Sequence, residues 1–402
     1  MTLTDAQRGF GRRPLSRTRD LLDHPLSTYY LIAGSTLLLL TLGVVMVLSA
    51  SSIESYRVFG SAYTLAQRQG SFAIVGVIAM FLAARTSVQL WRGLARGGIF
   101  VSIGLLIAVL VIGVEVYGQR NWIEIFGPFR FQPSEFAKIA LILWGADLLA
   151  RRDQRIRTWG QLLIPILPVT LMIMVLVLLE GDYGNAMVIG MIAAGLLFVA
   201  GAPLRLFAGF AVVGVFGTWL LTLAAPYRTE RITAWLHPSV DQLGIGWQVT
   251  QGQYALGTGG IWGVGLGASR EKWGSLPEAH TDFIFPVIGE ELGLIGTCAV
   301  LVLIGSLAFA IFRLARSTQD PFVRSASAGV GLWIVIQAVV NIGAVLGVLP
   351  ITGVPLPLVS YGGSSLLPTL VALGILMAFA RQEPGARTAL RRKSTAQSLR
   401  QR

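Results

Sequence analysis

Three groups of polar residues stand at the ends of long apolar runs, where charged side chains could do chemistry at a membrane surface. The strongest lies in the stretch 269–291, in which Asp282 precedes an apolar Phe-Ile-Phe run. Its further candidates are Lys272, His280 and Glu290. Ionisable groups at membrane depth are costly and usually face a partner or a wet cavity. Asp282 is therefore the candidate base, whereas His280 also fits a solvated loop position.

The second group opens the fourth apolar run with Gln132-Pro133-Ser134-Glu135. Proline suits an early helical position, and Glu135 and Lys138, three residues apart, share one helix face. Two interpretations stay open: an ion pair that satisfies itself, or a carboxylate and an ammonium lining a wet groove.

The third group is the turn Glu180-Gly181-Asp182-Tyr183. Its two acids could bind a cation, but an aspartate before a helix more often caps the free N–H groups, so capping by Asp182 is the favoured interpretation. One cysteine and three histidines rule out a cysteine-based zinc site and leave little for a histidine cage. No metal ligands are assigned.

The elements that position these groups follow from composition. Of the 402 residues, 54% are hydrophobic and only 13% charged, whereas about a quarter are charged in a soluble protein. A bilayer-spanning helix needs roughly 20 apolar residues, and ten runs approach that length. We predict an all-α polytopic membrane protein with spans near 29–50, 66–84, 97–114, 134–150, 160–179, 183–201, 205–225, 285–313, 325–348 and 363–381.

Orientation follows from the basic residues. With ten spans both termini share a side, and that side carries 23 of the 32 Lys and Arg residues, which places both termini in the cytoplasm. The domains are a basic tail 1–27, a membrane domain 28–381 and a basic tail 382–402. The basic clusters are dispersed between apolar runs, so the net charge of +12 indicates a membrane and not nucleic acid.

A large extracytoplasmic loop, 226–284, joins the seventh and eighth spans. We expect short helices near 228–236 and 246–256 within it. The glycine-rich stretch 257–267 has no strand before it, so nucleotide binding there is rejected. A helix from Phe283 to Arg313 would be about 46 Å long, and we expect Pro286 and Gly289 to break it, leaving Asp282 and Glu290 on irregular backbone around a cavity.

A site on the outer face has no nucleotide to use, so a bond-forming enzyme there needs an activated substrate such as a lipid-linked pyrophosphate. In glycosyl transfer a carboxylate can remove the proton of the acceptor hydroxyl. Cations assist the departing pyrophosphate. Asp282 suits the first role, and the second suits the cations Lys272, Arg270, Arg120 and Lys138.

At these residues the chain resembles the SEDS family of cell-wall polymerases (FtsW, RodA and SpoVE) over roughly residues 28–381. The shared motifs are Arg120-Asn121-Trp122, Gln132-Pro133-Ser134-Glu135 with Lys138, Gly181-Asp182-Tyr183-Gly184, Ala255-Leu256-Gly257, His280-Thr281-Asp282-Phe283, Glu290-Glu291-Leu292-Gly293, Pro355-Leu356-Pro357 and Ser360-Tyr361-Gly362-Gly363-Ser364-Ser365. Asn121, Gly181 and Asn185 depart from the usual residues, and Asn121 puts the donor contact of Arg120 in question.

The resemblance implies a peptidoglycan glycosyltransferase that polymerises lipid II on the outer face of the bacterial cytoplasmic membrane. It implies Asp282 as the catalytic base. Substrate contacts are expected from Glu135, Lys138, Arg120, Trp122, Asp182, Lys272, His280, Glu290 and Ser364. The implied partners are a class B penicillin-binding protein (an FtsI-like transpeptidase), other divisome proteins and membrane lipids. No cofactor is implied with certainty, and a divalent cation, Mg²⁺ or Mn²⁺, stays open.

The exit of the first span and the basic N-terminal extension are more similar to the division members, which favours septal synthesis. Elongation-type polymerisation is the alternative. Two other classes also stay open: a transporter that flips the same lipid, and a structural scaffold with idle polar sites. Transporters usually keep their charges near the bilayer midplane, whereas here the acids cluster at the outer loops.

Overall fold

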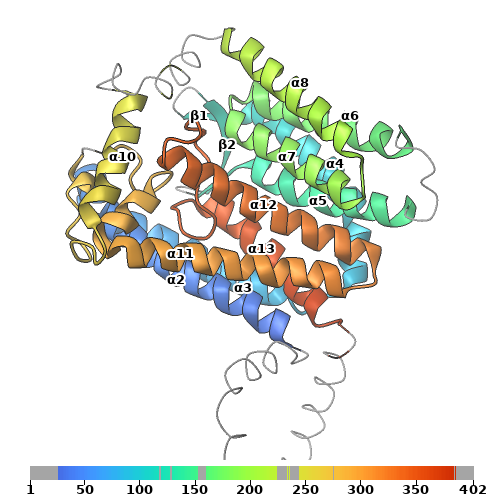
Figure 1. The fold of residues 1–402 in the computed structure, drawn as a ribbon, viewed down its shortest axis with the longest axis horizontal. Helices are drawn as coiled ribbons and strands as arrows, with labels where there is room; N and C mark the ends of the chain where they lie inside the picture. Colours follow the sequence, from blue (N-terminus) through green and yellow to red (C-terminus); the bar gives the residue numbers. More distant parts are fainter. Residues whose placement is uncertain are drawn as a thin grey trace, which may run out of the picture.

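The computed structural model is a bundle of long helices (Figure 1). It describes residues 26–116, 119–126, 129–152, 160–223, 244–274 and 276–383, together with 233, 235 and 385. Most of the two predicted basic tails and most of the expected helix 228–236 lie outside the described residues.

Each predicted span overlaps one helix. The ten helices are α2 (Ser27–Phe59), α3 (Thr64–Ala83), α4 (Val88–Ile112), α5 (Pro133–Arg152), α6 (Gly160–Leu179), α7 (Tyr183–Val199), α8 (Leu204–Leu223), α11 (Ile284–Ser317), α12 (Pro321–Val345) and α13 (Gly363–Ala380). Six of them, α2, α3, α4, α11, α12 and α13, are long and apolar enough to cross a membrane. The chain is therefore a multi-pass membrane protein, and ten spans with cytoplasmic termini stay a prediction.

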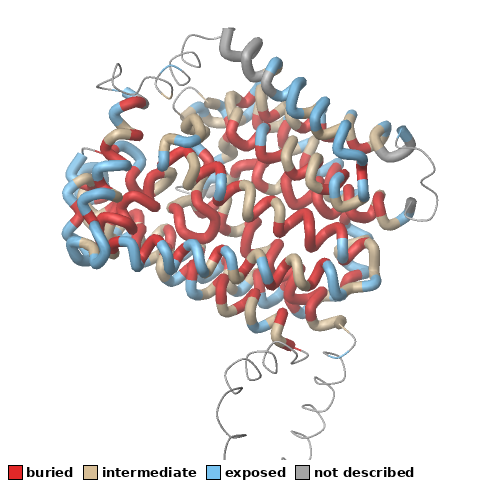
Figure 2. Tube along the Cα trace, in the orientation of Figure 1, coloured by how far each residue is buried: buried red, intermediate tan, exposed pale blue. Residues whose placement is uncertain are grey.

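Helices α12 and α13 lie near the centre of the view in Figure 1, where the backbone in Figure 2 is mostly buried. In the most apolar window of α13, 83% of residues are buried, against 28% in α3 and in α4. Figure 2 also shows mostly buried backbone along α5. A helix inside the bundle can carry polar groups that lipid would not tolerate, because its neighbours supply the partners.

The loop between α4 and α5 forms a small antiparallel sheet that the all-α prediction missed. Its strands are β1 (Val114–Val116), β2 (Gln119–Phe126) and β3 (Phe129–Phe131), in the order β1-β2-β3. The Gly127-Pro128 pair between β2 and β3 is a turn signal flanked by aromatic and β-branched residues. This signal was available in the sequence.

The predicted break of α11 at Pro286 and Gly289 is wrong, because the helix runs through both residues. Its backbone leaves helical geometry at Gly293, with φ +67° and ψ −163°. Glu290 consequently lies on regular helix, not on irregular backbone. The remaining stretch 294–317 is about 36 Å long at 1.5 Å per residue, which suits one bilayer crossing.

The glycine-rich stretch after α10 (Ile245–Gly259) provides hydrogen-bond partners for backbone groups of α11 on either side of its interruption at Gly293. The backbone N–H of Val264 donates to the Glu290 carbonyl at 2.9 Å, and the N–H of Leu294 donates to the Gly260 carbonyl at 2.9 Å. A Cβ on Gly263 would lie 2.2 Å from the Glu291 carbonyl oxygen. The glycines therefore allow close packing on α11, and α10 itself confirms the helix expected near 246–256.

Gly293→Ala is expected to destabilise the protein strongly. A Cβ there would lie 2.4 Å from the Ile261 carbonyl oxygen, and the φ of +67° is unfavourable for any L side chain. The two effects together should cost at least about 2 kcal/mol. Gly305→Ala on the same helix is the control, since nothing lies within 4 Å of its Cβ. Thermal unfolding in detergent checks this, and equal melting temperatures for the two variants would contradict the account.

Candidate active site

The loop 346–362, between α12 and α13, enters the helix bundle through two glycine contacts. A Cβ on Gly43 of α2 would lie 2.7 Å from the Leu358 carbonyl oxygen, and one on Gly184 of α7 would lie 2.5 Å from the Thr352 carbonyl oxygen. The loop backbone therefore packs where any larger residue on α2 or α7 would exclude it. Leu358, buried in this loop, has a φ of +66°. Such backbone strain in a non-glycine residue often marks a functional site.

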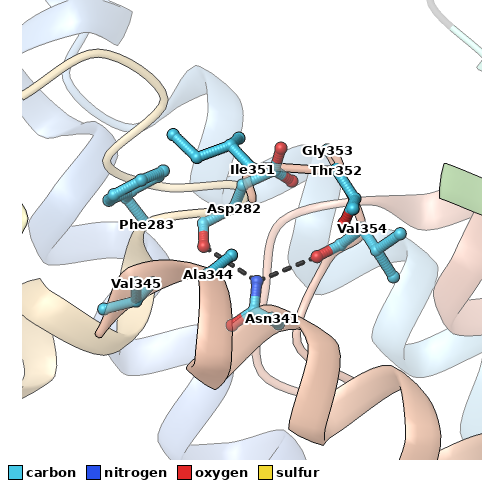
Figure 3. A pocket seen from close by; sticks show the side chains of 9 residues that line it. All are labelled: Asp282, Phe283, Asn341, Ala344, Val345, Ile351, Thr352, Gly353 and Val354. Atoms are coloured by element: carbon cyan, nitrogen blue, oxygen red, sulfur yellow. Dashed lines mark hydrogen bonds between the residues drawn. The ribbon is translucent and has the colours of Figure 1, made fainter. Parts of the chain in front are cut away.

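Asp282 lies in the turn before α11 and is half-buried. It lines a small pocket with Phe283, with Asn341, Ala344 and Val345 of α12, and with residues 351–354 of the loop (Figure 3). The Asn341 side-chain amide donates to the Asp282 carbonyl at 2.8 Å and to the Val354 carbonyl at 2.8 Å. Figure 3 shows this amide between the two carbonyls.

The two residues before Asp282 are fixed by the end of the same loop. The Ser360 hydroxyl donates to the Thr281 carbonyl at 2.6 Å, and the backbone N–H of Tyr361 donates to the His280 carbonyl at 2.9 Å. Three consecutive carbonyls, those of residues 280–282, are therefore held by α12 and the loop. A carboxylate placed on such a segment is preorganised, which a catalytic base requires.

Lys138 lies at the centre of a buried polar cluster. Its Nζ, with no exposed surface, donates to Glu135 Oε1 at 2.7 Å and to Asn185 Oδ1 at 3.0 Å. It also lies 3.5 Å from Gln337 Oε1 and 5.1 Å from the centre of the Trp333 ring. The predicted ion pair between Glu135 and Lys138 is thus confirmed. The Lys138 ammonium already has its hydrogen-bond acceptors within the protein.

Gln337 and Asn341, one helical turn apart on α12, connect this cluster to Asp282. The Gln337 side-chain amide accepts from Trp333 Nε1 at 2.7 Å and donates to the Pro355 carbonyl at 3.0 Å. Asn341 binds the adjacent Val354 carbonyl and Asp282. Both amides are buried. One face of α12 therefore joins the lysine cluster, the loop and the Asp282 backbone.

Asp182 caps α7, as predicted. Its Oδ1 accepts from the backbone N–H of Asn185 at 3.0 Å, and its Oδ2 accepts from Gln132 Nε2 at 2.6 Å. Neighbouring Glu180 is buried, and neither of its carboxylate oxygens has a hydrogen-bond partner among the described residues. Burial raises the pKa of the Glu180 carboxyl to about 9, and the nearby Asp182 charge contributes. Glu180 is therefore protonated at neutral pH.

Lys272 and Glu290 lie in a separate cluster that fastens the outer loop to α11 and α2. Lys272 Nζ lies 3.3 Å from Glu291 Oε1, and the Ser49 hydroxyl of α2 donates to the same carboxylate at 2.6 Å. Glu290 accepts from the Ser269 hydroxyl at 2.5 Å and from the Arg270 backbone N–H at 2.8 Å. The charged groups of Lys272, Glu290 and Glu291 therefore hold the outer loop against α11 and α2.

Other predicted residues are spread around the site. Arg120 and Trp122 lie on β2, where the Arg120 backbone N–H donates to the Glu180 carbonyl at 3.2 Å. Ser364 is buried in the first turn of α13. His280 Nδ1 lies 3.3 Å from Glu54 Oε2, and its ring lies 5.4 Å from that of Tyr361. The structure thus places His280 between Glu54 and Tyr361, outside the residues that line the Asp282 pocket, and places Arg120 and Trp122 at the sheet.

Sequence reasoning missed a cationic group around Tyr361. Burial raises the pKa of the Tyr361 hydroxyl, while hydrogen bonding from Arg68 and the charges of Arg68 and Arg130 oppose the rise. Arg68 lies in the second turn of α3, and Arg130 lies on β3, where it pairs with Glu124 at 3.2 Å. These arginines stood outside the quoted motifs. Gln337 and Asn341 could have been found as two amides four residues apart in an apolar run.

The family model for FtsW, RodA and SpoVE, described as cell cycle protein, matches residues 29–384. The chain belongs to this family. It is 42% identical over 381 residues to the probable peptidoglycan glycosyltransferase FtsW of Mycobacterium tuberculosis, covering 94% of this chain and 72% of that protein. Stage V sporulation protein E of Bacillus subtilis is 39% identical, covering 86% of this chain and 95% of that one.

Solved structures agree with this assignment. A chain from a peptidoglycan synthase complex that coordinates polymerization and crosslinking aligns with a TM-score of 0.73 and 33% identity, over 90% of this chain and 99% of its own length. The rod shape determining protein RodA of Thermus thermophilus aligns with a TM-score of 0.66 and 31% identity, over 91% and 99%.

Asn341→Ala is expected to lower catalysis more than stability alone would explain. The change leaves the Asp282 and Val354 carbonyls without their donor, a cost of about 1–3 kcal/mol for each buried group. It also releases the Asp282 backbone. Glycan-strand synthesis and the melting temperature should be measured together, with Gln253→Ala as the control, because its amide also bonds a carbonyl of this loop, that of Leu346 at 3.2 Å. Equal activity in the two variants would refute the positioning role.

Glu180→Gln is expected to stabilise the protein increasingly as pH rises. Because the folded-state pKa is raised from 4.5 to about 9, the wild type loses stability as pH increases between those values, whereas glutamine has no proton to lose. The gap in melting temperature should widen from about pH 5 to about pH 8. Glu115→Gln, at an exposed strand position, is the control. A gap that stays constant with pH would contradict a protonated Glu180.

Proposed function

We propose that this protein is a peptidoglycan glycosyltransferase that polymerises lipid II on the outer face of the cytoplasmic membrane, with Asp282 as general base. The observation that carries the proposal is the placement of Asp282 beside a pocket, on backbone fixed through residues 280–282. Membership of the family, with relatives named as peptidoglycan glycosyltransferases, supplies the reaction class.

The proposed step is a displacement at the anomeric carbon of the donor sugar. The acceptor hydroxyl transfers its proton to the Asp282 carboxylate as its oxygen forms the new glycosidic bond, and the lipid pyrophosphate leaves as an anion. Arg68, which hydrogen-bonds Tyr361, can stabilise that anion, because Lys138, Lys272 and Arg130 are engaged in ion pairs. A divalent cation would neutralise the same charge, and assays with and without Mg²⁺ and Mn²⁺ test whether one is used.

The remaining predicted residues divide by their contacts. We assign Glu135, Lys138 and Asp182 to the framework that orients the site. Lys138 pairs with Glu135 and bonds Asn185 of α7, and Asp182 accepts from Gln132, the residue before α5. Lys272 and Glu290 hold the outer loop. His280, Arg120, Trp122 and Ser364 remain proposed substrate contacts.

We further propose a role in septal synthesis with a class B penicillin-binding protein and other divisome proteins. The FtsW names among the relatives support division, and the similarity to a chain of a peptidoglycan synthase complex supports a transpeptidase partner. The RodA-like structure keeps elongation as the alternative. Depletion in the source bacterium distinguishes them: septal synthesis predicts loss of division, and elongation predicts loss of cell shape.

Asp282→Asn is expected to lower glycan-strand synthesis by about 10²–10⁴-fold, because the amide cannot accept the proton. The purified protein should be assayed with labelled lipid II, with and without its transpeptidase, and the melting temperature should stay near that of the wild type. A folded Asp282→Asn protein that polymerises at the wild-type rate would remove Asp282 as the base.

The same assay separates the other functional classes. Movement of labelled lipid across vesicles without polymerisation by the wild type would favour the transporter. Absence of both activities, with normal growth of Asp282→Asn cells, would favour the scaffold.

A further inference from the structure

Asp147 is a buried carboxylate at the opposite end of α5 from Glu135. The two residues are twelve positions apart, which is about 18 Å along the helix. Only 3% of the Asp147 side chain is exposed, yet three arginines converge on it. They are Arg92 and Arg96 on the first turns of α4 and Arg151 on the last turn of α5. We call these four residues the Asp147 cluster.

All three arginines in the Asp147 cluster approach the carboxylate through Nε. The distances are 3.0 Å from Arg92 Nε to Oδ1, 2.8 Å from Arg151 Nε to Oδ2 and 3.6 Å from Arg96 Nε to Oδ2. No terminal guanidinium nitrogen of the three has a hydrogen-bond partner in the described part of the chain. The side chains of Arg92, Arg151 and Arg96 are 38%, 49% and 59% exposed, respectively.

Neutralising Asp147 does not require three cations. Arg92 and Arg151 already donate one hydrogen bond to each carboxylate oxygen. The cluster therefore carries two positive charges in excess, on guanidinium groups whose stems are fixed by a shared anchor. Planar guanidinium groups with free terminal nitrogens match the oxygens of a phosphate group.

The Asp147 cluster lies at the predicted cytoplasmic end of the bundle. Arg92 lies over the Phe322 ring at the start of α12, with its guanidinium carbon 5.8 Å from the ring centre. The Arg381 guanidinium at the end of α13 donates to the Ala84 carbonyl at 3.0 Å, four residues before α4 begins. In the predicted orientation these helix ends face the cytoplasmic leaflet, where basic pockets beside membrane helices bind anionic headgroups.

We propose that the Asp147 cluster binds the phosphate of an anionic phospholipid headgroup, such as that of phosphatidylglycerol or cardiolipin, in the cytoplasmic leaflet. Asp147 acts as the anchor that holds the guanidinium groups with their terminal nitrogens toward the lipid. The site is separate from Asp282 and does not depend on the proposed polymerase function.

Arg96→Gln in the full-length protein tests this site, because Arg96 makes the longest contact to Asp147 and is the most exposed of the three. Native mass spectrometry of delipidated protein titrated with phosphatidylglycerol should show about fivefold weaker binding than the wild type. Phosphatidylcholine should bind both proteins alike. Arg205→Gln is the control, since Arg205 is exposed at the predicted cytoplasmic start of α8.

Arg151→Gln provides a second variant, and melting temperatures in neutral lipid identify any variant that fails to fold. The proposal is supported if Arg96→Gln and Arg151→Gln both weaken phosphatidylglycerol binding and Arg205→Gln does not. It is overturned if all three variants bind alike. It is also overturned if inorganic phosphate displaces the lipid at equal concentration, because the cluster would then recognise a free anion.

Discussion

A fully buried ammonium group is the constraint on which the rest of the structure depends. Lys138 has no exposed surface, and its acceptors come from three different helices: Glu135 on α5, Asn185 on α7 and Gln337 on α12. Leaving a buried charge without its partner typically costs about 3–5 kcal/mol. The arrangement of α5, α7 and α12 is therefore fixed around one nitrogen atom.

That arrangement determines where Asp282 lies. The Gln337 side chain accepts from the Lys138 ammonium and donates to the Pro355 carbonyl. Asn341, one helical turn further along α12, donates to the Asp282 backbone carbonyl. Glycines on α2 and α7 let the loop 346–362 pack between the helices, so its backbone can reach these amides. The proposed base is thus positioned by backbone hydrogen bonds from elements inside the bundle and not by the outer loop alone.

Much of this was predictable because the signals are local. Apolar run length predicts the helices, the spacing of Glu135 and Lys138 predicts their pairing, and the position of Asp182 before a helix predicts its cap. The break at Gly293 was not predictable from local rules, because it depends on contact with the distant stretch 260–264. Proline and glycine at 286 and 289 looked like better breakers, yet a proline within the first helical turn is tolerated. The roles of Gln337 and Asn341 likewise depend on a loop that approaches from outside their helix.

Hydrogen exchange of the segment 276–288 in Gln337→Leu tests the central claim most directly. Among the described residues, the hydrogen bonds of Gln337 go to Lys138, Trp333 and the Pro355 carbonyl and not to this segment, so the account attributes a change there to the loop 346–362 and α12. The account predicts faster exchange in 276–288 and 349–362 than in the wild type, with no change in Ser306→Ala, which removes a contact with Ser35 between α2 and α11. Unchanged exchange around Asp282 in a folded Gln337→Leu protein would contradict the claim that the buried lysine cluster positions the catalytic carboxylate.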